Sequence, residues 1–230
     1  MKHFLNAEML AVNAKAIPVD TAIVQEFAEP ERFPGRLISL QPSRNRWKSD
    51  IEWISADDEE AFRVFESAFY RLAIPEHVMP YIDIEREVRL YLGSLVVRSR
   101  CQDTYFHTDW KKLDNEAFTV ITPVTDNARE FGLLYRKANT EIGEYAYRSG
   151  EAILFGDNFS HSTKPGRSER PVMLLCFQFG SDKMEYWPGI YEQLHTQGTQ
   201  LRLPDGTFTR TGKTPHHVVN GQARKRAFAR

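Results

Sequence analysis

The pattern of apolar and polar residues changes character near residue 88. Before that point the best periodic stretch is helical, because aromatic and leucine side chains recur at helix spacing between residues 62 and 72. Ser55 is a suitable N-cap for this stretch, and Pro75 ends it. We therefore predict a helix that begins at Ser55, and a shorter one over residues 20–27.

After residue 88 the pattern becomes a series of short apolar or alternating segments separated by turn residues. These segments, including one around His107, predict strands over residues 88–97, 104–110, 118–124, 133–135, 144–148, 152–155 and 172–179. Their number and spacing favour an all-β sandwich or barrel, and a jelly roll fits best.

We accordingly expect one mainly β domain with flanking helices over residues 1–230. It divides into a helical and irregular N-terminal part (1–87), a jelly-roll core (88–180) and a C-terminal extension (181–230). Residues 30–54 are expected to be irregular because prolines punctuate them. Residues 203–208 predict a hairpin turn.

Composition narrows the function classes. The net charge is −1 and the pI is about 6.7, so bulk charge gives no case for binding nucleic acid. Residues 1–16 lack the apolar core of a signal peptide, and no apolar run is long enough for a membrane span. The chain has only Cys101 and Cys176, which favours reduced thiols and a cytoplasmic protein.

The candidate chemistry lies at His107 and Asp109. Residues two apart in a strand point to the same face, so this imidazole and this carboxylate could share one cation. A second histidine, His161, follows an apolar segment and a turn 52 residues after Asp109. Two histidines and one carboxylate can occupy one face of an octahedral metal, as in non-haem Fe(II) oxygenases.

The order His107-x-Asp109, His161 and then Arg170 at the head of a strand resembles the Fe(II)/2-oxoglutarate-dependent dioxygenase superfamily. The chain is similar both to its phytanoyl-CoA dioxygenase-like branch and to its prolyl-hydroxylase-like branch, over about residues 88–180. Phytanoyl-CoA-type sequences often place the cofactor arginine two residues further on, where this chain has Val172. The nine-residue spacing from His161 to Arg170 fits the prolyl-hydroxylase pattern better.

This resemblance implies a double-stranded β-helix that holds Fe(II) through His107, Asp109 and His161. It also implies 2-oxoglutarate and O2 as co-substrates, with release of succinate and CO2 and hydroxylation of an unactivated C–H bond. Arg170 would anchor the far carboxylate of 2-oxoglutarate, with Arg167 as the alternative. Neutral hydrogen bonds to that carboxylate could come from three residues: Thr119, Thr122 and Tyr135.

Two other function classes stay open. A zinc-dependent hydrolase or lyase would use the same three ligands, since zinc also takes histidine and carboxylate. A cupin-like protein would bind a small molecule without turnover. The arginine favours the oxygenase.

The partner is expected to be a small-molecule substrate that carries an anionic group, because four cations follow the proposed ligands: Lys111, Lys112, Lys164 and Arg167. A peptide held by Trp110 or by the basic patch at residues 44–48 is the alternative. The sequence predicts no nucleic acid or membrane partner, and it does not indicate an oligomeric state.

Two further features have plain structural explanations. Asp157 could support a metal ligand or form a turn. The neighbours His216 and His217 have no carboxylate at a useful spacing in the sequence, so we expect them to be structural or exposed.

Overall fold

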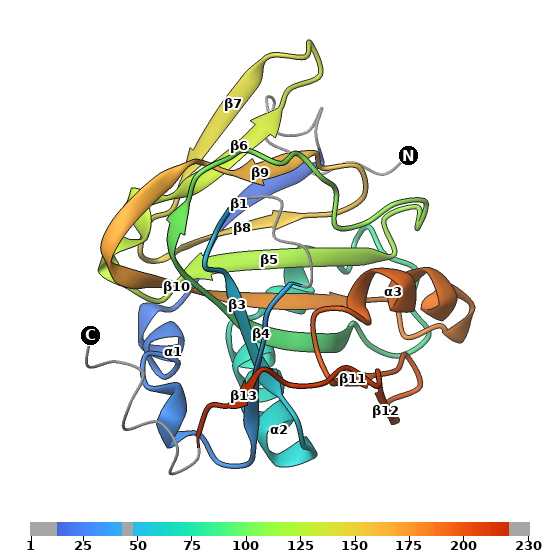
Figure 1. Ribbon diagram of the computed structural model, residues 1–230. Helices are drawn as coiled ribbons and strands as arrows, with labels where there is room; N and C mark the ends of the chain where they lie inside the picture. Colours follow the sequence, from blue (N-terminus) through green and yellow to red (C-terminus); the bar gives the residue numbers. More distant parts are fainter. Residues whose placement is uncertain (1–12, 43–47, 221–230) are drawn as a thin grey trace.

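A computed structural model describes residues 13–42 and 48–220 of the chain. Its largest element is a major sheet of antiparallel strands in the order β1-β8-β5-β10-β4-β3-β2-β13 (Figure 1). These strands are β1 (Ala14–Pro18), β2 (Leu37–Leu40), β3 (Glu52–Ala56), β4 (Arg89–Cys101), β5 (Ala117–Pro123), β8 (Glu151–Phe155), β10 (Gly166–Gly180) and β13 (His217–Val218).

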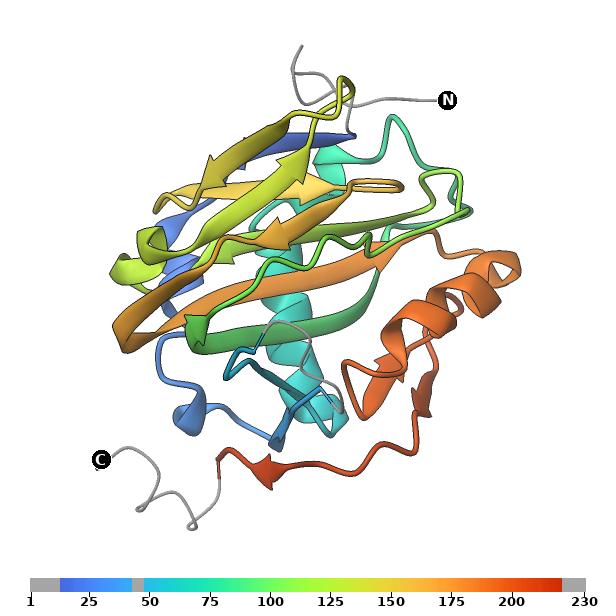
Figure 2. The same cartoon turned by 45° about the horizontal axis from the view of Figure 1, so that its top comes forward.

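A minor sheet in the order β7-β6-β9 lies over one face of the major sheet, and α1 and α2 cover the other face (Figures 1 and 2). The minor sheet contains β6 (Gly132–Arg136), β7 (Ile142–Ala146) and β9 (His161–Thr163). The helices are α1 (Thr21–Gln25), α2 (Glu59–Arg71) and α3 (Trp187–Leu194), with 3-10 turns at Pro30–Arg32, Ile74–His77, Asp126–Glu130 and Met184–Tyr186. A separate hairpin joins β11 (Gln200–Arg202) to β12 (Phe208–Arg210).

Both faces of the major sheet are buried, so its central strands feed two hydrophobic cores. On β4, Leu95 packs into the core shared with α1 and α2, whereas its neighbour Val96 packs into the core between the two sheets. Leu175 and Cys176 divide between the same two cores on β10. This alternation explains why the strands are continuous apolar runs in the sequence.

The prediction of a mainly β jelly roll with flanking helices is confirmed by these packed antiparallel sheets. The expected short helix near residue 20 is α1, and the Asp20 carboxylate accepts a hydrogen bond from the Ala22 amide (2.8 Å) as its N-cap. The hairpin at residues 203–208 is also present. No helix in the described part of the chain has the length and apolar character needed to cross a bilayer.

Three local predictions are wrong. Residues 30–54 are not irregular throughout, since they contain β2 and the start of β3, which join the sheet of the jelly-roll core. The main helix begins at Glu59, because Asp58 is its N-cap and Ser55 belongs to β3. The segment around His107 forms one isolated bridge to His161 and no strand.

These N-cap assignments give a stability prediction. The Asp58 carboxylate accepts hydrogen bonds from the amides of Ala61 (2.9 Å) and Arg36 (2.7 Å), so Asp58→Ala is expected to destabilise the fold by about 1–2 kcal/mol. The Ser55 hydroxyl is buried and has no hydrogen-bond partner within residues 13–42 and 48–220, so Ser55→Ala is expected to cost much less. Urea unfolding of both variants measures the difference, and an equal cost would contradict the assignment.

Candidate metal centre

Backbone pairing across the two sheets brings the predicted histidines together. The His107 amide donates to the His161 carbonyl (2.9 Å), and the His161 amide donates back to the His107 carbonyl (2.9 Å). This bridge places the loop after β4 against the first residue of β9. His107, Asp109 and His161, the central cluster, therefore converge although they do not share a strand.

Ligand atoms of the central cluster lie within 4.8 Å of one another. The Nε2 atoms of His107 and His161 are 3.6 Å and 3.8 Å from Oδ1 of Asp109. The Nδ1 atom of each ring faces a carbonyl oxygen two residues earlier, that of Tyr105 (3.0 Å) or Phe159 (3.1 Å). A carbonyl can only accept, so Nδ1 carries the proton in both rings and both Nε2 lone pairs face Asp109.

Burial favours the uncharged form of one histidine of the cluster, His161. His161 is enclosed by protein, and desolvation lowers its pKa to about 4, although the Asp109 carboxylate acts in the opposite direction. Its imidazole is therefore neutral near pH 7, which is the state that binds a metal ion. Two imidazoles and one carboxylate, all aimed at one point, could hold a divalent cation with positions left open.

A buried hydrogen-bond chain orients the carboxylate of the cluster. Trp110 Nε1 donates to the Thr119 hydroxyl (2.9 Å), which in turn donates to Oδ2 of Asp109 (3.0 Å). Asp157 holds the following loop, because its carboxylate accepts from the Leu113 amide (2.8 Å). Asp157 therefore stabilises the turn after Asp109, and it does not line the cavity beside the cluster.

A cavity of about 270 Å³, the central cavity, opens beside the cluster between the two sheets. One end is lined by Arg98, Tyr147 and Thr163. Gln178, on β10, lines the other end. It lies six residues, or about 20 Å, along the strand from Val172, which is the residue paired with Arg98. The cavity thus has a guanidinium end and an amide end.

Arg98 is the most unusual residue of the cavity. It is only 9% exposed, and within the described residues it forms no salt bridge with a carboxylate. Its guanidinium donates to the Thr163 hydroxyl (2.7 Å), whereas its Nε–H has no hydrogen-bond partner among the described residues. Burial lowers the pKa of Arg98, but an arginine stays charged near neutral pH. No carboxylate of the described residues lies at salt-bridge distance from this guanidinium, and Asp50 acts on it only from further away.

The predicted arginines lie elsewhere. The Arg170 side chain is 72% exposed and pairs with Asp126 (2.9 Å), and Arg167 lines a separate surface hollow beside Pro165. Neither lines the central cavity. A break in the regular β10–β4 pairing between residues 167 and 172 explains why their spacing from His161 does not bring them inward.

The three residues expected to give neutral hydrogen bonds to 2-oxoglutarate do not line the cavity either. Thr119 supports Asp109, the Thr122 hydroxyl donates to the Glu151 carbonyl (3.0 Å), and Tyr135 packs against Phe159. The four cations expected at the mouth do not line the cavity either, and Lys164 is paired with Glu144 (2.6 Å).

Sequence reasoning missed Arg98 and Tyr147. A signal for Arg98 was present, because Ser94, Val96 and Arg98 share one side of an alternating strand. A charged residue whose place in the alternation puts its side chain on the inward face of a buried strand requires a partner or a ligand.

The hydrogen-bond chain yields a test of metal affinity. Thr119→Val removes the donor to Asp109 and is expected to weaken Fe(II) or Ni(II) binding about 10- to 100-fold. Thr122→Val is the matched control, since that hydroxyl bonds to a backbone carbonyl on the far side of its strand. Metal titration by calorimetry compares the two, and equal affinities would contradict the role of Thr119.

Neither a scan against models of known families nor a search of curated proteins finds a match to this sequence. Solved structures do match. The carbocyclase SnoK of nogalamycin biosynthesis, described as non-heme and alpha-ketoglutarate-dependent, aligns with a TM-score of 0.58 and 11% identity, covering 76% of this chain and 82% of SnoK.

Two further matches come from Streptomyces hygroscopicus and Pseudomonas putida. HygX from the former, with nickel and 2-oxoglutarate bound, aligns at a TM-score of 0.52 with 15% identity, covering 75% of this chain and 84% of HygX. A prolyl-4-hydroxylase from the latter aligns at 0.51 with 13% identity, covering 75% of this chain and 95% of that enzyme. The chain therefore has the fold of non-haem, 2-oxoglutarate-dependent enzymes.

Proposed function

We propose that this protein is an Fe(II)- and 2-oxoglutarate-dependent oxygenase that hydroxylates a small molecule. One observation carries the proposal: the central cluster and an unpaired, buried guanidinium line the same cavity. The first provides a facial set of metal ligands, and the second requires an anion. A dicarboxylate that chelates the metal at one end and neutralises arginine at the other satisfies both needs.

The protein's own groups are suited to hold that co-substrate. Arg98 would bind the far carboxylate through its unpartnered Nε–H and the rest of its planar fork. Burial raises the pKa of Tyr147, so its phenol stays protonated and can donate to the same carboxylate. When bound, Fe(II) and 2-oxoglutarate supply the oxidising chemistry, with O2 consumed and succinate and CO2 released.

Strand register supports the assignment to Arg98. Arg98 on β4 is the direct partner of Val172 on β10, and opposed residues of an antiparallel pair project to the same face. Val172 occupies the position where phytanoyl-CoA-type sequences often carry the cofactor arginine. Arg98 would therefore supply, from the neighbouring strand, a guanidinium to the same side of the cavity. We propose it in place of Arg170 and Arg167.

This arrangement favours the oxygenase over both alternatives. A zinc hydrolase or lyase would need the central cluster and would leave Arg98 without a role. A cupin-like binding protein would need the cavity and would leave the aligned Nε2 lone pairs without a role. The solved relatives in this fold include a hydroxylase, a carbocyclase and an epimerase, so the outcome of the oxidation is part of the proposal.

The amide end of the cavity suggests the substrate class. Gln178 donates to Gln197 (2.9 Å), and its own side-chain carbonyl oxygen is buried without a hydrogen-bond partner in the described part of the chain. Gln193 and Thr196 lie beside them, so this end presents neutral donors and acceptors. We propose a small substrate without anionic groups and rich in hydroxyl or amine groups, since no described lysine or arginine besides Arg98 lines the cavity. Among the solved structures, HygX holds hygromycin B.

Two buried free cysteines, Cys101 and Cys176, support a reducing compartment such as the cytoplasm.

The central test is an anaerobic titration. Fe(II) followed by 2-oxoglutarate is expected to give a weak visible charge-transfer band in the unmodified chain and none in Asp109→Ala. A screen of neutral, cationic and anionic small molecules, scored by succinate release and by a product heavier by one oxygen atom, then identifies the substrate class. The absence of both the band and 2-oxoglutarate affinity would refute the oxygenase.

A second test separates the arginines. Arg98→Gln is expected to weaken 2-oxoglutarate binding about 10- to 100-fold, since a charged hydrogen bond contributes about 1.5–3 kcal/mol, while Fe(II) affinity stays unchanged. Arg170→Gln is the matched control, because that side chain is exposed. Both affinities come from the anaerobic titration, and a larger loss in Arg170→Gln would return the role to Arg170.

A third test addresses the amide end. Gln178→Leu keeps the side-chain volume but removes the unpartnered carbonyl, so it is expected to raise the KM for the substrate about tenfold, on the scale of one hydrogen bond. The 2-oxoglutarate affinity is expected to remain unchanged, since Gln178 lies at the far end from Arg98. An unchanged KM would move the substrate contacts away from this end.

A further inference from the structure

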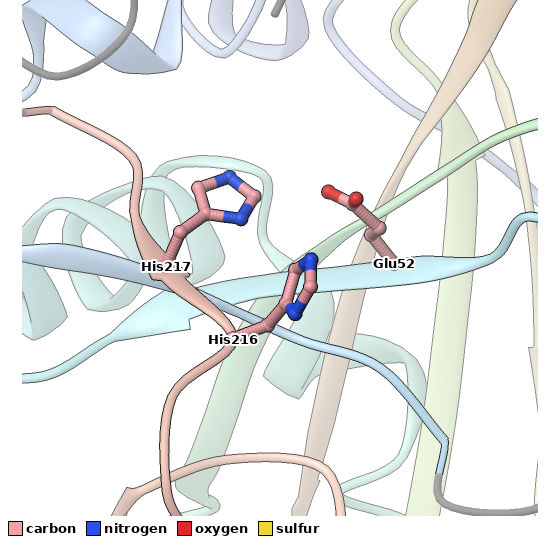
Figure 3. A group of neighbouring side chains, drawn as sticks. All are labelled: Glu52, His216 and His217. Carbon is pink, nitrogen blue, oxygen red and sulfur yellow. The ribbon is translucent and has the colours of Figure 1, made fainter.

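A second cluster of metal-ligating side chains lies at the edge of the major sheet. His216, His217 and Glu52, the edge cluster, offer ligand atoms that all lie within 4.8 Å of one another. Figure 3 shows both imidazole rings and the carboxylate turned toward a common space. The expectation that the histidine pair has no useful carboxylate is therefore wrong, because Glu52 reaches it from a strand far away in the sequence.

The local backbone explains how adjacent histidines face the same side. His217 is the first residue of β13 and pairs with Ser39 on β2, whereas His216 lies in a bend just before the strand. The alternation of strand side chains therefore does not apply between them. The two rings meet edge to face, with centroids 5.2 Å apart.

Glu52 is held in position by polar neighbours. Its carboxylate accepts hydrogen bonds from the Ser39 hydroxyl (3.1 Å) and the Gln41 side-chain amide (3.1 Å). Ser39 is itself the strand partner of His217, so one residue connects the carboxylate to the histidine strand. A carboxylate oriented in this way beside two imidazoles is a partly organised ligand set.

We propose that Glu52, His216 and His217 form a second metal site, which binds Zn²⁺ or a similar divalent transition-metal ion. Imidazole and carboxylate are ligands that zinc prefers, and the exposure of His216 leaves room for water as a fourth ligand. Metal–nitrogen bonds are about 2 Å long, so we expect the ligand atoms to draw closer together when the ion binds, with the exposed His216 ring free to rotate toward it.

The edge cluster is separate from the central cluster. Trp53 lines the central cavity, whereas its neighbour Glu52 lines a surface hollow with Ile54, Val97 and Met173. Successive residues of β3 point to opposite faces, so the two clusters lie on opposite sides of the major sheet. Binding at the edge cluster therefore does not depend on the proposed oxygenase function.

A metal ion at the edge cluster would act as a clip, because it would fasten the short edge strand β13 to the rest of the major sheet. The β13 strand has only two residues, at the edge of the sheet, and it pairs with β2 alone. A metal shared by Glu52 and both histidines would link β13 directly to β3, across β2. Ile51 and Trp53 flank Glu52 and line the central cavity, so the clip would also fix the start of β3 and the residue before it.

The test counts metal ions in the full chain. Zinc titration against a chromophoric chelator is expected to give two equivalents in the unmodified chain. In a chain with Asp109→Ala and His161→Ala, which removes the central cluster, one equivalent is expected to remain. Adding His216→Gln or Glu52→Gln is expected to weaken that remaining equivalent at least about tenfold, and to abolish the rise in Tm that zinc produces.

Matched controls are His195→Gln and Glu31→Gln, which remove a histidine and a carboxylate outside both clusters. His216 is exposed, so His216→Gln decides the outcome if Glu52→Gln fails to fold, with circular dichroism as the check. Equal zinc affinity in His216→Gln and His195→Gln would overturn the site. Loss of the charge-transfer band with retained zinc binding would refute only the proposed oxygenase.

Discussion

The burial of both faces of the major sheet is the constraint on which the rest of the structure depends. A side chain on β4 or β10 has only two environments, the core under the helices or the space between the sheets. Neither gives free access to bulk water, so a polar side chain there needs a partner within the protein or a ligand. Arg98 and Gln178 each meet this need only in part, and both line the central cavity. Incomplete polar pairing in an otherwise apolar layer is what marks this cavity as a binding site.

The sequence predicted what local patterns determine. Continuous apolar runs bounded by turn residues located the strands of the core, and Asp20 located a helix start. The approach of His107 and Asp109 to His161 was also predicted correctly, although the physical reason differed. The pair is brought to His161 by an isolated bridge and a buried hydrogen-bond chain, and not by the pleat of a strand. A two-residue spacing is compatible with both arrangements, so it could not distinguish them.

The features that the sequence did not predict depend on how strands far apart in the chain pair with one another. Ser55 and Asp58 are both good N-caps, and the choice between them depends on whether β3 pairs with β4 through Ser55. Similarly, counting residues from His161 selects Arg170, but the break in pairing before Val172 leaves that side chain in solvent. The inward position opposite Val172 belongs to Arg98, more than 60 residues earlier in the chain. The spacing of two residues gives only the number of residues between them. The face of the sheet to which a side chain points depends also on each β-bulge along that stretch.

The two histidine clusters show why ligand identity alone does not define a function. Each offers two imidazoles and one carboxylate within 4.8 Å. The central cluster lines a cavity, with both imidazoles fixed by backbone carbonyls and a guanidinium in the same lining. The edge cluster has an exposed histidine and no enclosed space among the described residues for a second reactant to be shielded from water. Enclosure strengthens electrostatic contacts and excludes water, so of the two clusters the central one offers the setting that the proposed oxidation requires. The setting of the edge cluster fits the proposed role of a metal that holds strands together.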